Sequence, residues 1–361
     1  MTNRLSVSII LIAISLLSGS CTRQIGPDTD AVSCQIVYDA GSSRTRLYIY
    51  ERTPSGWLAH RGPESDALAD PVRGIRGKTM SDAGVVVENI VAALENIRRD
   101  GPLDSKGEPE WLAFDWPNHC TVDAVAVYAT AGMRLAEQHD SEASELIWKM
   151  LNDGLNEKLL MPVSTRTLSG YEEGLFAWLA IREDVVDENF GLAEMGGASV
   201  QVTFPCADCE SSKMVRVKDQ LISIFSHSFL GLGQDEAWKK FGPVPSCERG
   251  VGLKHPDWQV GECATHMPVS SEAVTGIRGR IMKIRGFDWY LTGAFRYMRD
   301  IDIDQYCRQG LDSGYQQSTS CFRAVYLDSV LDALGVPESA EPTDVDWTLG
   351  AVICTATRCL E

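Results

Sequence analysis

Two short turns in this chain, each headed by an acid, have the composition of phosphate-binding loops. They are Asp39-Ala-Gly-Ser-Ser-Arg-Thr45 and Glu194-Met-Gly-Gly-Ala-Ser-Val200. Short apolar runs flank each turn, which predicts that each forms the tip of a β-hairpin. Consecutive N–H groups in a glycine-containing turn can converge on an anion, and the leading carboxylate can hold a metal ion or its water shell. Either turn alone could be an ordinary hairpin, but the repetition favours two lobes facing one cleft.

A third segment, Ser169-Gly-Tyr-Glu-Glu-Gly-Leu-Phe-Ala-Trp178, carries an acid pair where an amphipathic helix is expected to begin. Ser169 and Glu172 have the spacing of a capping box, which accounts for Glu172 in structural terms. Glu173 is left as a candidate general base, although the helix dipole alone also favours a glutamate in a first turn.

Composition sets the broad class of the protein. The 361 residues are 44% hydrophobic, which is enough for a large core and for two domains. The formal net charge of −17 argues against binding to nucleic-acid polymers, because such binding relies on basic patches. Small nucleotides remain possible ligands, since backbone N–H groups and a divalent cation can hold them within one cleft.

The N-terminal segment is interpreted as an export signal over residues 1–20, followed by a tether over 21–31. Its apolar run, Val7 to Leu17, is too short to span a bilayer. Leu17-Ser-Gly-Ser-Cys21 resembles the cleavage box of bacterial lipoproteins, so Cys21 is a candidate for lipidation. An ordinary secretory signal cut nearby is the alternative. The expected location is the periplasm or the cell surface.

Ten cysteines follow Cys21, and an even number suits disulfides in an oxidising compartment. Zinc binding by Cys206 and Cys209 is disfavoured, because no second ligand pair lies at a suitable spacing. Spacing favours the pairs Cys206–Cys209, Cys247–Cys263, Cys307–Cys321 and Cys354–Cys359, which leaves Cys34 with Cys120.

Expected strands alternate with expected helices, which indicates an α/β protein. The first lobe is predicted over residues 32–163 plus 338–361, and the second over 164–337. Strands are expected at 35–38, 46–50 and 123–130, and helices at 81–99, 141–160, 171–181 and 287–297.

Taken together, these segments resemble the nucleoside triphosphate diphosphohydrolases, or apyrases, of the actin-like ATPase superfamily. Exopolyphosphatases share the paired phosphate loops but usually lack the forms Ala-Thr-Ala-Gly-Met-Arg and Glu-Gly-x-Phe-x-Trp, which are both present here. The resemblance implies two ribonuclease-H-like (actin-like) lobes with the active site in the cleft between them. The matching stretches, in order, are Asp39 to Thr45, Ala129 to Arg134, Ser169 to Trp178, Glu194 to Gln201 and Phe229 to Ala237, with shorter matches at Cys321 to Leu327 and Trp347 to Gly350.

The resemblance also implies roles for individual residues in a hydrolysis that converts NTP to NDP to NMP with Mg²⁺ or Ca²⁺. Glu173 would be the general base, and Ser199 and Gln201 would orient the attacking water. Arg134 is as well suited to a structural ion pair as to the site. The phosphate-binding residues would be Ser42, Ser43, Arg44, Thr45, Gly196, Gly197 and Ala198; Asp39, Glu194 and Thr130 would hold the metal through water; and Arg296, Tyr297, Arg323 and Tyr326 are candidates for stacking on the nucleobase.

One departure from the family pattern is Glu194, where the family usually has Asp. The longer side chain keeps the carboxylate, so activity is expected to survive with an altered metal preference or rate. A polyphosphate phosphohydrolase and a non-catalytic nucleotide-binding module remain as alternatives. The protein is expected to be a monomer that reaches a membrane only through a lipid anchor.

Overall fold

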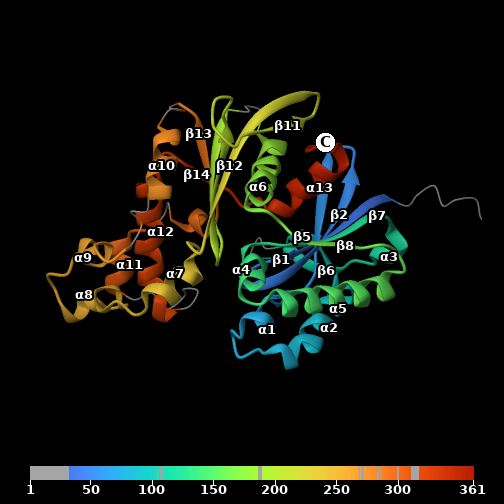
Figure 1. Ribbon diagram of the computed structural model, residues 1–361, viewed down its shortest axis with the longest axis horizontal. Coiled ribbons are helices and arrows are strands. Elements are labelled where there is room, and N and C mark those ends of the chain that lie inside the picture. The colour runs from blue at the N-terminus through green and yellow to red at the C-terminus, as the bar shows by residue number, and fades with distance from the viewer. Residues whose placement is uncertain are drawn as a thin grey trace, which may run out of the picture.

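The computed structural model describes residues 32–361 except 104, 106–108, 186–188, 268, 270, 271, 283, 285, 299, 300 and 310–316. The export signal, the tether and Cys21 lie outside the described residues. Two lobes stand side by side, and helices α6 (Gly170–Asp184) and α13 (Trp347–Thr357) lie between them (Figure 1). Each lobe is built on its own sheet, which confirms the predicted two-lobed α/β fold.

The first lobe's sheet has the strand order β6-β5-β3-β2-β1-β7-β8, with β4 paired to β2. Strands β1 and β7 are parallel neighbours at its centre. Central parallel strands are covered on both faces, which explains why the segment from Ile36 to Tyr38 is continuously apolar. The strands are β1 (Val32–Ala40), β2 (Arg44–Thr53), β3 (Gly56–Arg61), β4 (Ser65–Asp66), β5 (Arg98–Leu103), β6 (Pro109–Ala113), β7 (Cys120–Ala129) and β8 (Ser164–Thr167).

Helices α2, α4 and α5 pack together and bury one face of this sheet. In α5, Asp140 caps the N-terminus by accepting from the Ala143 N–H at 3.0 Å. Ile147, Leu151 and Leu155 then recur at helical spacing and are fully buried. The helical segments are α1 (Asp70–Arg73), η1 (Met80–Asp82), α2 (Ala83–Ala92), η2 (Ala93–Asn96), α3 (Trp116–His119), α4 (Ala131–His139) and α5 (Ser141–Leu159).

The second lobe has a mixed sheet in the order β11-β12-β10-β9-β13-β14, with most of its helices on the side away from the first lobe (Figure 1). Helix α12 lies within this lobe's core. The elements are β9 (Phe190–Met195), β10 (Ser199–Pro205), β11 (Lys213–Val217), β12 (Gln220–Leu230), α7 (Gln234–Phe241), η3 (Pro245–Cys247), α8 (Val251–Lys254), α9 (Val260–Ala264), α10 (Glu272–Ile281), β13 (Asp288–Gly293), η4 (Ala294–Tyr297), α11 (Ile303–Gln309), η5 (Gln317–Thr319), α12 (Ser320–Leu334) and β14 (Glu341–Pro342).

Helices α6 and α13 join the lobes through a separate apolar cluster that also takes side chains from both sheets. Helix α6 is buried from Glu173 to Ile181, as expected of a helix that is apolar nearly all round. Hydrogen bonds anchor α13 to β2: the Tyr48 hydroxyl donates to Asp346 at 2.8 Å, and the Tyr50 and Thr348 hydroxyl oxygens are 2.6 Å apart. The pair of helices therefore forms the mechanical link between the lobes.

Five disulfides cross-link the described chain. They confirm the four pairs predicted from spacing and the remaining pair of Cys34 with Cys120. The bonds are Cys34–Cys120, Cys206–Cys209, Cys247–Cys263, Cys307–Cys321 and Cys354–Cys359. No helix in the described part of the chain is long and apolar enough to cross a membrane.

Two sequence-based element assignments were wrong in detail. The helix expected over 81–99 ends by Asn96, and Arg98 begins β5, because pairing with β6 takes over from the helical pattern. The aromatic helix expected over 287–297 is strand β13 followed by one 3₁₀ turn. Trp289 and Leu291 are buried in the second sheet, and Gly293 ends the strand at a φ of +59°.

The boundaries between the lobes also differ from the sequence-based expectation. Strand β8 belongs to the first sheet, although residues from 164 onward were assigned to the second lobe. Strand β14 pairs with β13 in the second sheet, although residues from 338 onward were assigned to the first. The chain therefore crosses between the sheets after Thr167 and again after Pro342.

Candidate active site

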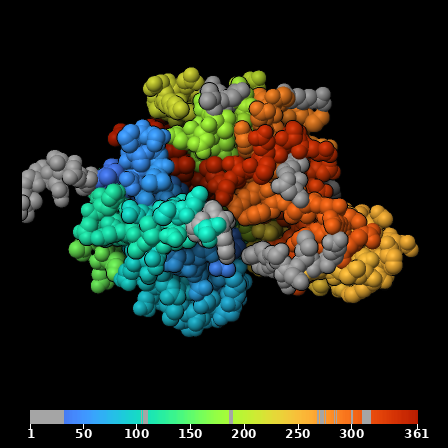
Figure 2. Space-filling view, turned by 180° about the vertical axis from the view of Figure 1, so that it is seen from behind, coloured from blue at the N-terminus to red at the C-terminus, as the bar shows by residue number. Residues whose placement is uncertain are grey.

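A cleft of about 870 Å³ lies between the two lobes, and both acid-headed turns line it. Its volume is within the range of pockets that bury small organic ligands. In Figure 2, seen from behind, the blue-to-cyan surface of the first lobe and the orange surface of the second lie on either side of the molecule. The predicted site residues that line the cleft are Asp39, Ser42, Ser43, Arg44, Thr130, Glu173, Glu194, Gly196, Gly197, Arg296, Tyr297 and Arg323.

The first turn connects β1 to β2, as predicted, and its register places Asp39 opposite Arg46. The Arg46 guanidinium donates to the Asp39 carboxylate at 3.2 Å and to Glu64 at 3.1 Å. Burial raises the pKa of Asp39 to about 7, and the nearby Asp346 carboxylate adds to this effect while Arg46 opposes it. Asp39 is thus a buried acid at the cleft wall with a cation beside it.

Helix α4 begins directly against the first turn. The Thr130 N–H donates to the Ala40 carbonyl at 3.3 Å. A Cβ atom on Gly132 would lie 2.7 Å from the Ser42 Cα, so only glycine allows this approach. The small residues at the start of Ala129-Thr-Ala-Gly-Met-Arg134 therefore let α4 begin beside the first turn.

The second turn connects β9 to β10, and the N-terminus of α7 holds its backbone. The N–H groups of Asp235 and Glu236 donate to the Gly197 carbonyl at 2.8 and 3.1 Å, and Gln234 N–H donates to Gly196. Because C=O and N–H point in opposite directions across a trans peptide, these bonds turn the following loop N–H groups away from α7. A Cβ atom on Gly233 would lie 2.3 Å from Ala198 N, which explains the glycine there.

Asp39 and Glu194, from opposite lobes, each have one buried carboxylate oxygen in the wall of the cleft. Among the described residues, Asp39 Oδ1 and Glu194 Oε2 are buried without a hydrogen-bond partner. Burial raises the pKa of Glu194 well above its ordinary value, and Glu173, Asp346 and Asp39 add like-charge repulsion. Oxygen atoms without partners in a buried acidic pocket are the donors that hard divalent cations prefer.

Glu173 projects from the first turn of α6, where the predicted capping box between Ser169 and Glu172 is present. Its side chain is 8% exposed, and it accepts a hydrogen bond from the Arg134 guanidinium. Burial raises the pKa of Glu173 to about 7, while the Arg134 charge opposes that rise. A carboxylate with a pKa near neutrality at a cleft wall has the properties of a general base.

Ser199 and Gln201 lie directly behind the second turn on β10. Both are buried, and Gln201 Nε2 donates to the Ser199 hydroxyl at 2.5 Å and to Ser228 at 3.2 Å. Gln201 Oε1 is buried with no partner among the described residues. Ser199 and Gln201 therefore form a polar wall beside Glu173. In this wall, the Gln201 Oε1 atom is still available to accept a hydrogen bond.

Hydrogen bonds and an ion pair join the lobes across the cleft. The Ser43 hydroxyl of the first turn donates to Asp235 of α7 at 2.8 Å. Asp235 also forms an ion pair with Arg323 at 2.8 Å, and Arg73 of α1 pairs with Glu236 at 2.9 Å. The structure therefore brings the two phosphate-loop candidates together at the base of the cleft.

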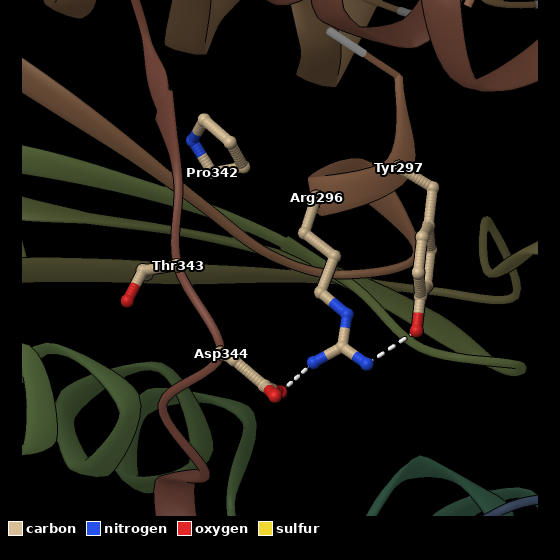
Figure 3. Close-up of a pocket in the computed structure, with 5 residues that line it drawn as sticks. All are labelled: Arg296, Tyr297, Pro342, Thr343 and Asp344. Carbon is tan, nitrogen blue, oxygen red and sulfur yellow. Dashed lines mark hydrogen bonds and ion pairs between the residues drawn. The ribbon is translucent and has the colours of Figure 1, made fainter. Parts of the chain in front are cut away.

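One edge of the cleft opens into a shallow pocket of about 340 Å³ beside η4 and β14 (Figure 3). The Arg296 side chain extends between Asp344, with which it forms an ion pair, and the Tyr297 hydroxyl, to which it donates. The guanidinium also lies 4.6 Å from the centre of the Tyr297 ring. Tyr297 is 58% exposed, so a flat ligand could reach its ring.

Comparison with known proteins finds one similar family and several distant relatives. Residues 117–244 match the GDA1/CD39 (nucleoside phosphatase) family. The chain therefore contains a region similar to the GDA1/CD39 family. The matched residues include Arg134, Glu173, both glycines of the second turn and Asp235, so the match covers the second turn and the start of α6.

Individual relatives are distant. Nucleoside-triphosphatase ntp-1 of Caenorhabditis elegans is 25% identical over 96% of this chain and 78% of its own length. Human ectonucleoside triphosphate diphosphohydrolase 2 is 28% identical over 64% of this chain and 47% of its own length, so the chain spans about half of that relative. The Aquifex aeolicus PPX-GPPA enzyme is a structural neighbour with a TM-score of 0.52 and 10% identity, covering 89% of this chain and 99% of that one, and shows the shared fold.

Several of the predicted site residues do not line the cleft or are engaged elsewhere. The Thr45 hydroxyl donates to the Asp66 carbonyl inside the first lobe at 2.9 Å. Tyr326 is fully buried and its hydroxyl donates to the Leu232 carbonyl at 2.8 Å, so its selection as a stacking residue was wrong. Arg323 reaches the cleft wall, but its guanidinium is engaged with Asp235.

Sequence reasoning missed other polar residues in or beside the cleft. Arg46 could have been found from the predicted hairpin, because the residue opposite Asp39 is fixed once the turn is placed. Asp235 lies within a motif that resembles the family but was given no role. Asp346 and Ser228 gave no sequence signal, because tertiary packing alone brings them near the carboxylates.

Proposed function

We propose that this chain is a divalent-cation-dependent hydrolase that removes terminal phosphates from nucleoside tri- and diphosphates. The observation that carries the proposal is Glu173, a buried carboxylate in the cleft that both acid-headed turns line. The match of residues 117–244 to the GDA1/CD39 family supports a nucleoside phosphatase, and the names of the relatives support nucleoside triphosphates and diphosphates as substrates.

The two turns would bind neighbouring phosphates of one substrate. Ser42, Ser43 and Arg44 supply hydroxyl and guanidinium donors from the first lobe. The second turn supplies backbone N–H groups beside Gly196 and Gly197, whose carbonyls are bound to α7. Donors from two lobes would fix the phosphate chain along the cleft, which is the positioning that phosphoryl transfer requires.

The buried acidic residues fit a divalent cation. Asp39 and Glu194 each have a buried oxygen without a partner among the described residues, and Thr130 lines the same cleft. In the described part of the chain, no group of three or more His, Cys, Asp or Glu residues could hold a metal ion directly. Holding Mg²⁺ or Ca²⁺ through water and substrate oxygens is therefore the mode that suits these residues. When bound, the cation would neutralise phosphate charge.

Glu173 would accept a proton from a water molecule as the water oxygen attacks the terminal phosphorus. The bond between that phosphorus and the bridging oxygen breaks, and the nucleotide leaves with one phosphate fewer. Ser199 and Gln201 would orient the water, since Gln201 Oε1 has no partner in the described structure. The proton held by Glu173 is then released to solvent or to the phosphate product.

The nucleobase would lie at the edge of the cleft beside Arg296 and Tyr297. Their flat guanidinium and phenol groups suit stacking on any purine or pyrimidine. The five disulfides fit an exported protein, which agrees with nucleotide hydrolysis outside the cytoplasm.

The test is phosphate release by the disulfide-intact protein spanning residues 22–361. ATP, ADP, AMP and polyphosphate are each supplied with Mg²⁺, with Ca²⁺ or with a chelator. We expect metal-dependent release from ATP and ADP, none from AMP, and loss of activity with the chelator. Release from polyphosphate alone would favour a polyphosphate phosphohydrolase, and release from no substrate would favour a nucleotide-binding module.

A glycine substitution tests the joint use of the two turns. A Cβ atom on Gly197 would lie 2.6 Å from Asp235 Oδ2, 2.6 Å from Ser42 Oγ and 2.8 Å from Ser43 Oγ. Gly197→Ala should therefore displace the Ser42, Ser43 and Asp235 side chains, break the Ser43–Asp235 hydrogen bond and lower kcat/KM for ATP by roughly 10²-fold, since small displacements of bound groups cost that much.

The comparison variant is Gly196→Ala, whose Cβ would meet only Ser199 O, at 3.9 Å. Steady-state kinetics of both variants check the prediction. Both glycines lie in the proposed phosphate loop, so the informative quantity is the ratio of kcat/KM between the two variants. We expect Gly196→Ala to keep a kcat/KM at least about tenfold higher than that of Gly197→Ala. Equal losses would show that the distance between the two turns does not limit the reaction.

A further inference from the structure

We propose that Arg134 is a positioning residue of the hydrolysis, which fixes the orientation and the negative charge of Glu173 through its guanidinium. This inference rests on the proposed function, because it assigns Glu173 the role of general base. Nothing in the match to the GDA1/CD39 family assigns Arg134 a role, and its sequence context left a purely structural ion pair equally open.

The Arg134 side chain contacts three other elements around Glu173, the proposed general base. The residue belongs to α4 of the first lobe. Its Nη2 donates to Glu173 Oε2 on α6 and lies 3.4 Å from the Ser199 hydroxyl on β10, while Nη1 donates to the Ser228 hydroxyl on β12 at 3.1 Å. One planar guanidinium therefore fixes the base relative to the polar wall that would orient the water.

The surrounding backbone is shaped to admit this guanidinium. A Cβ atom on Gly170 would lie 2.6 Å from Arg134 Nη1 and 2.3 Å from the Ser228 Cβ. Glycine at the start of α6 is therefore required for Arg134 to reach Glu173. The Arg134 side chain is only 15% exposed, so water screens its charge weakly.

The charges around Glu173 make a cation necessary if the carboxyl is to act as a base. In the described structure, Arg134 from α4 is the charged group that lowers the pKa of Glu173, while Glu194 on β9 and Asp39 on β1 are nearby acids whose own pKa values Glu173 raises. Burial favours the protonated carboxyl, whereas the charge and hydrogen bond of Arg134 and a hydrogen bond from Gln201 favour the ionised form. A protonated carboxyl cannot take a proton from water, so removing Arg134 should shift activity to higher pH.

The experiment compares the pH dependence of kcat for wild type, Arg134→Met and Arg134→Lys, with ATP and saturating Mg²⁺. For Arg134→Met we expect the acid limb to move up by at least about one pH unit, which is roughly a tenfold loss on that limb, with little change in KM. Added guanidinium ion should recover part of the lost activity. Arg134→Lys should give a smaller shift, since it keeps the charge but loses the planar fork.

The matched control is Arg166→Met. Arg166 pairs at 2.8 Å with Glu172, the neighbour of Glu173, and its guanidinium lies over Tyr128 outside the cleft. Its removal should leave the pH profile of kcat unchanged. A purely structural ion pair would predict similar losses of stability in Arg134→Met and Arg166→Met with no change in either profile.

The outcomes separate this inference from the proposed function. A wild-type protein that hydrolyses no nucleotide would refute the proposed function. An active wild type with the same acid limb in Arg134→Met would refute the role of Arg134 alone. If Arg134→Met does not fold, the smaller shift in Arg134→Lys decides the question, and an unchanged profile and kcat in that variant would overturn the proposal.

Discussion

Glu173→Gln is expected to lower kcat for ATP by about 10²- to 10⁴-fold while leaving nucleotide affinity nearly unchanged. The amide has almost the same shape as the carboxylate and can remain beside Arg134, but it cannot accept a proton from water. Phosphate release measured with saturating Mg²⁺–ATP gives kcat, and binding of a non-hydrolysable ATP analogue by calorimetry gives the affinity.

The chain offers a closely matched control in the preceding residue. Glu172 lies in the same helical turn, accepts from the Ser169 N–H at 3.0 Å and pairs with Arg166. Glutamine also serves at this position of a capping box, so Glu172→Gln should keep both activity and fold. Equal turnover in wild type and Glu173→Gln would exclude Glu173 as the base, whereas loss in both variants would indicate damage to α6.

Gly350→Ala is expected to be among the most destabilising single-methyl additions in this protein. A Cβ atom at Gly350 would lie only 1.7 Å from the carbonyl oxygen of Phe176, where α13 crosses α6. Backbone cannot move aside as a flexible side chain can, so the two helices must separate. We expect a loss of about 1–3 kcal/mol or more in the free energy of unfolding.

The same substitution should impair catalysis, because Phe176 lies one turn after Glu173 on α6. Moving α6 by even 1 Å would misplace the base, which can cost roughly 10²-fold in rate. Denaturant unfolding and kcat measured on one preparation check both effects.

Gly279→Ala is the control for this substitution, since it adds the same methyl group to an exposed site in helix α10. A Cβ atom there would lie within 4 Å of no described residue beyond its own stretch of helix, and alanine favours a helix by about 0.5–1 kcal/mol over glycine. The substitution should therefore leave stability equal or higher. Comparable unfolding energies for Gly350→Ala and wild type would show that the α6–α13 crossing adapts to the added carbon.

The features that sequence predicted well are those that local rules determine. Glycine and serine residues between short apolar runs correctly predicted both hairpins. A serine three residues before Glu172 correctly predicted the start of α6. The resemblance to a known family then supplied the relation between these segments. Most of the residues selected from it line one cleft, which local patterns alone could not have shown.

The features that sequence missed depend on tertiary pairing. Trp289 and Leu291 lie in a run that suits either a helix or a strand, and parallel pairing with β9 selects the strand. The ion pair between Asp235 and Arg323 joins residues 88 positions apart, so no spacing rule indicates it. The partner of Glu173 likewise comes from another lobe, and the role of Arg134 therefore follows from the fold.

The disulfides have a consequence for how this protein can be made. Along the described chain, every cysteine is bonded to the next cysteine in sequence, from Cys34 with Cys120 to Cys354 with Cys359. A chain that enters an oxidising compartment from its N-terminus would form each native bond from consecutive arriving thiols. Oxidation in order of arrival thus leads to the native pattern without reshuffling. None of these five bonds ties one sheet to the other, so the noncovalent contacts of α6, α13 and the cleft alone set how the described lobes sit together.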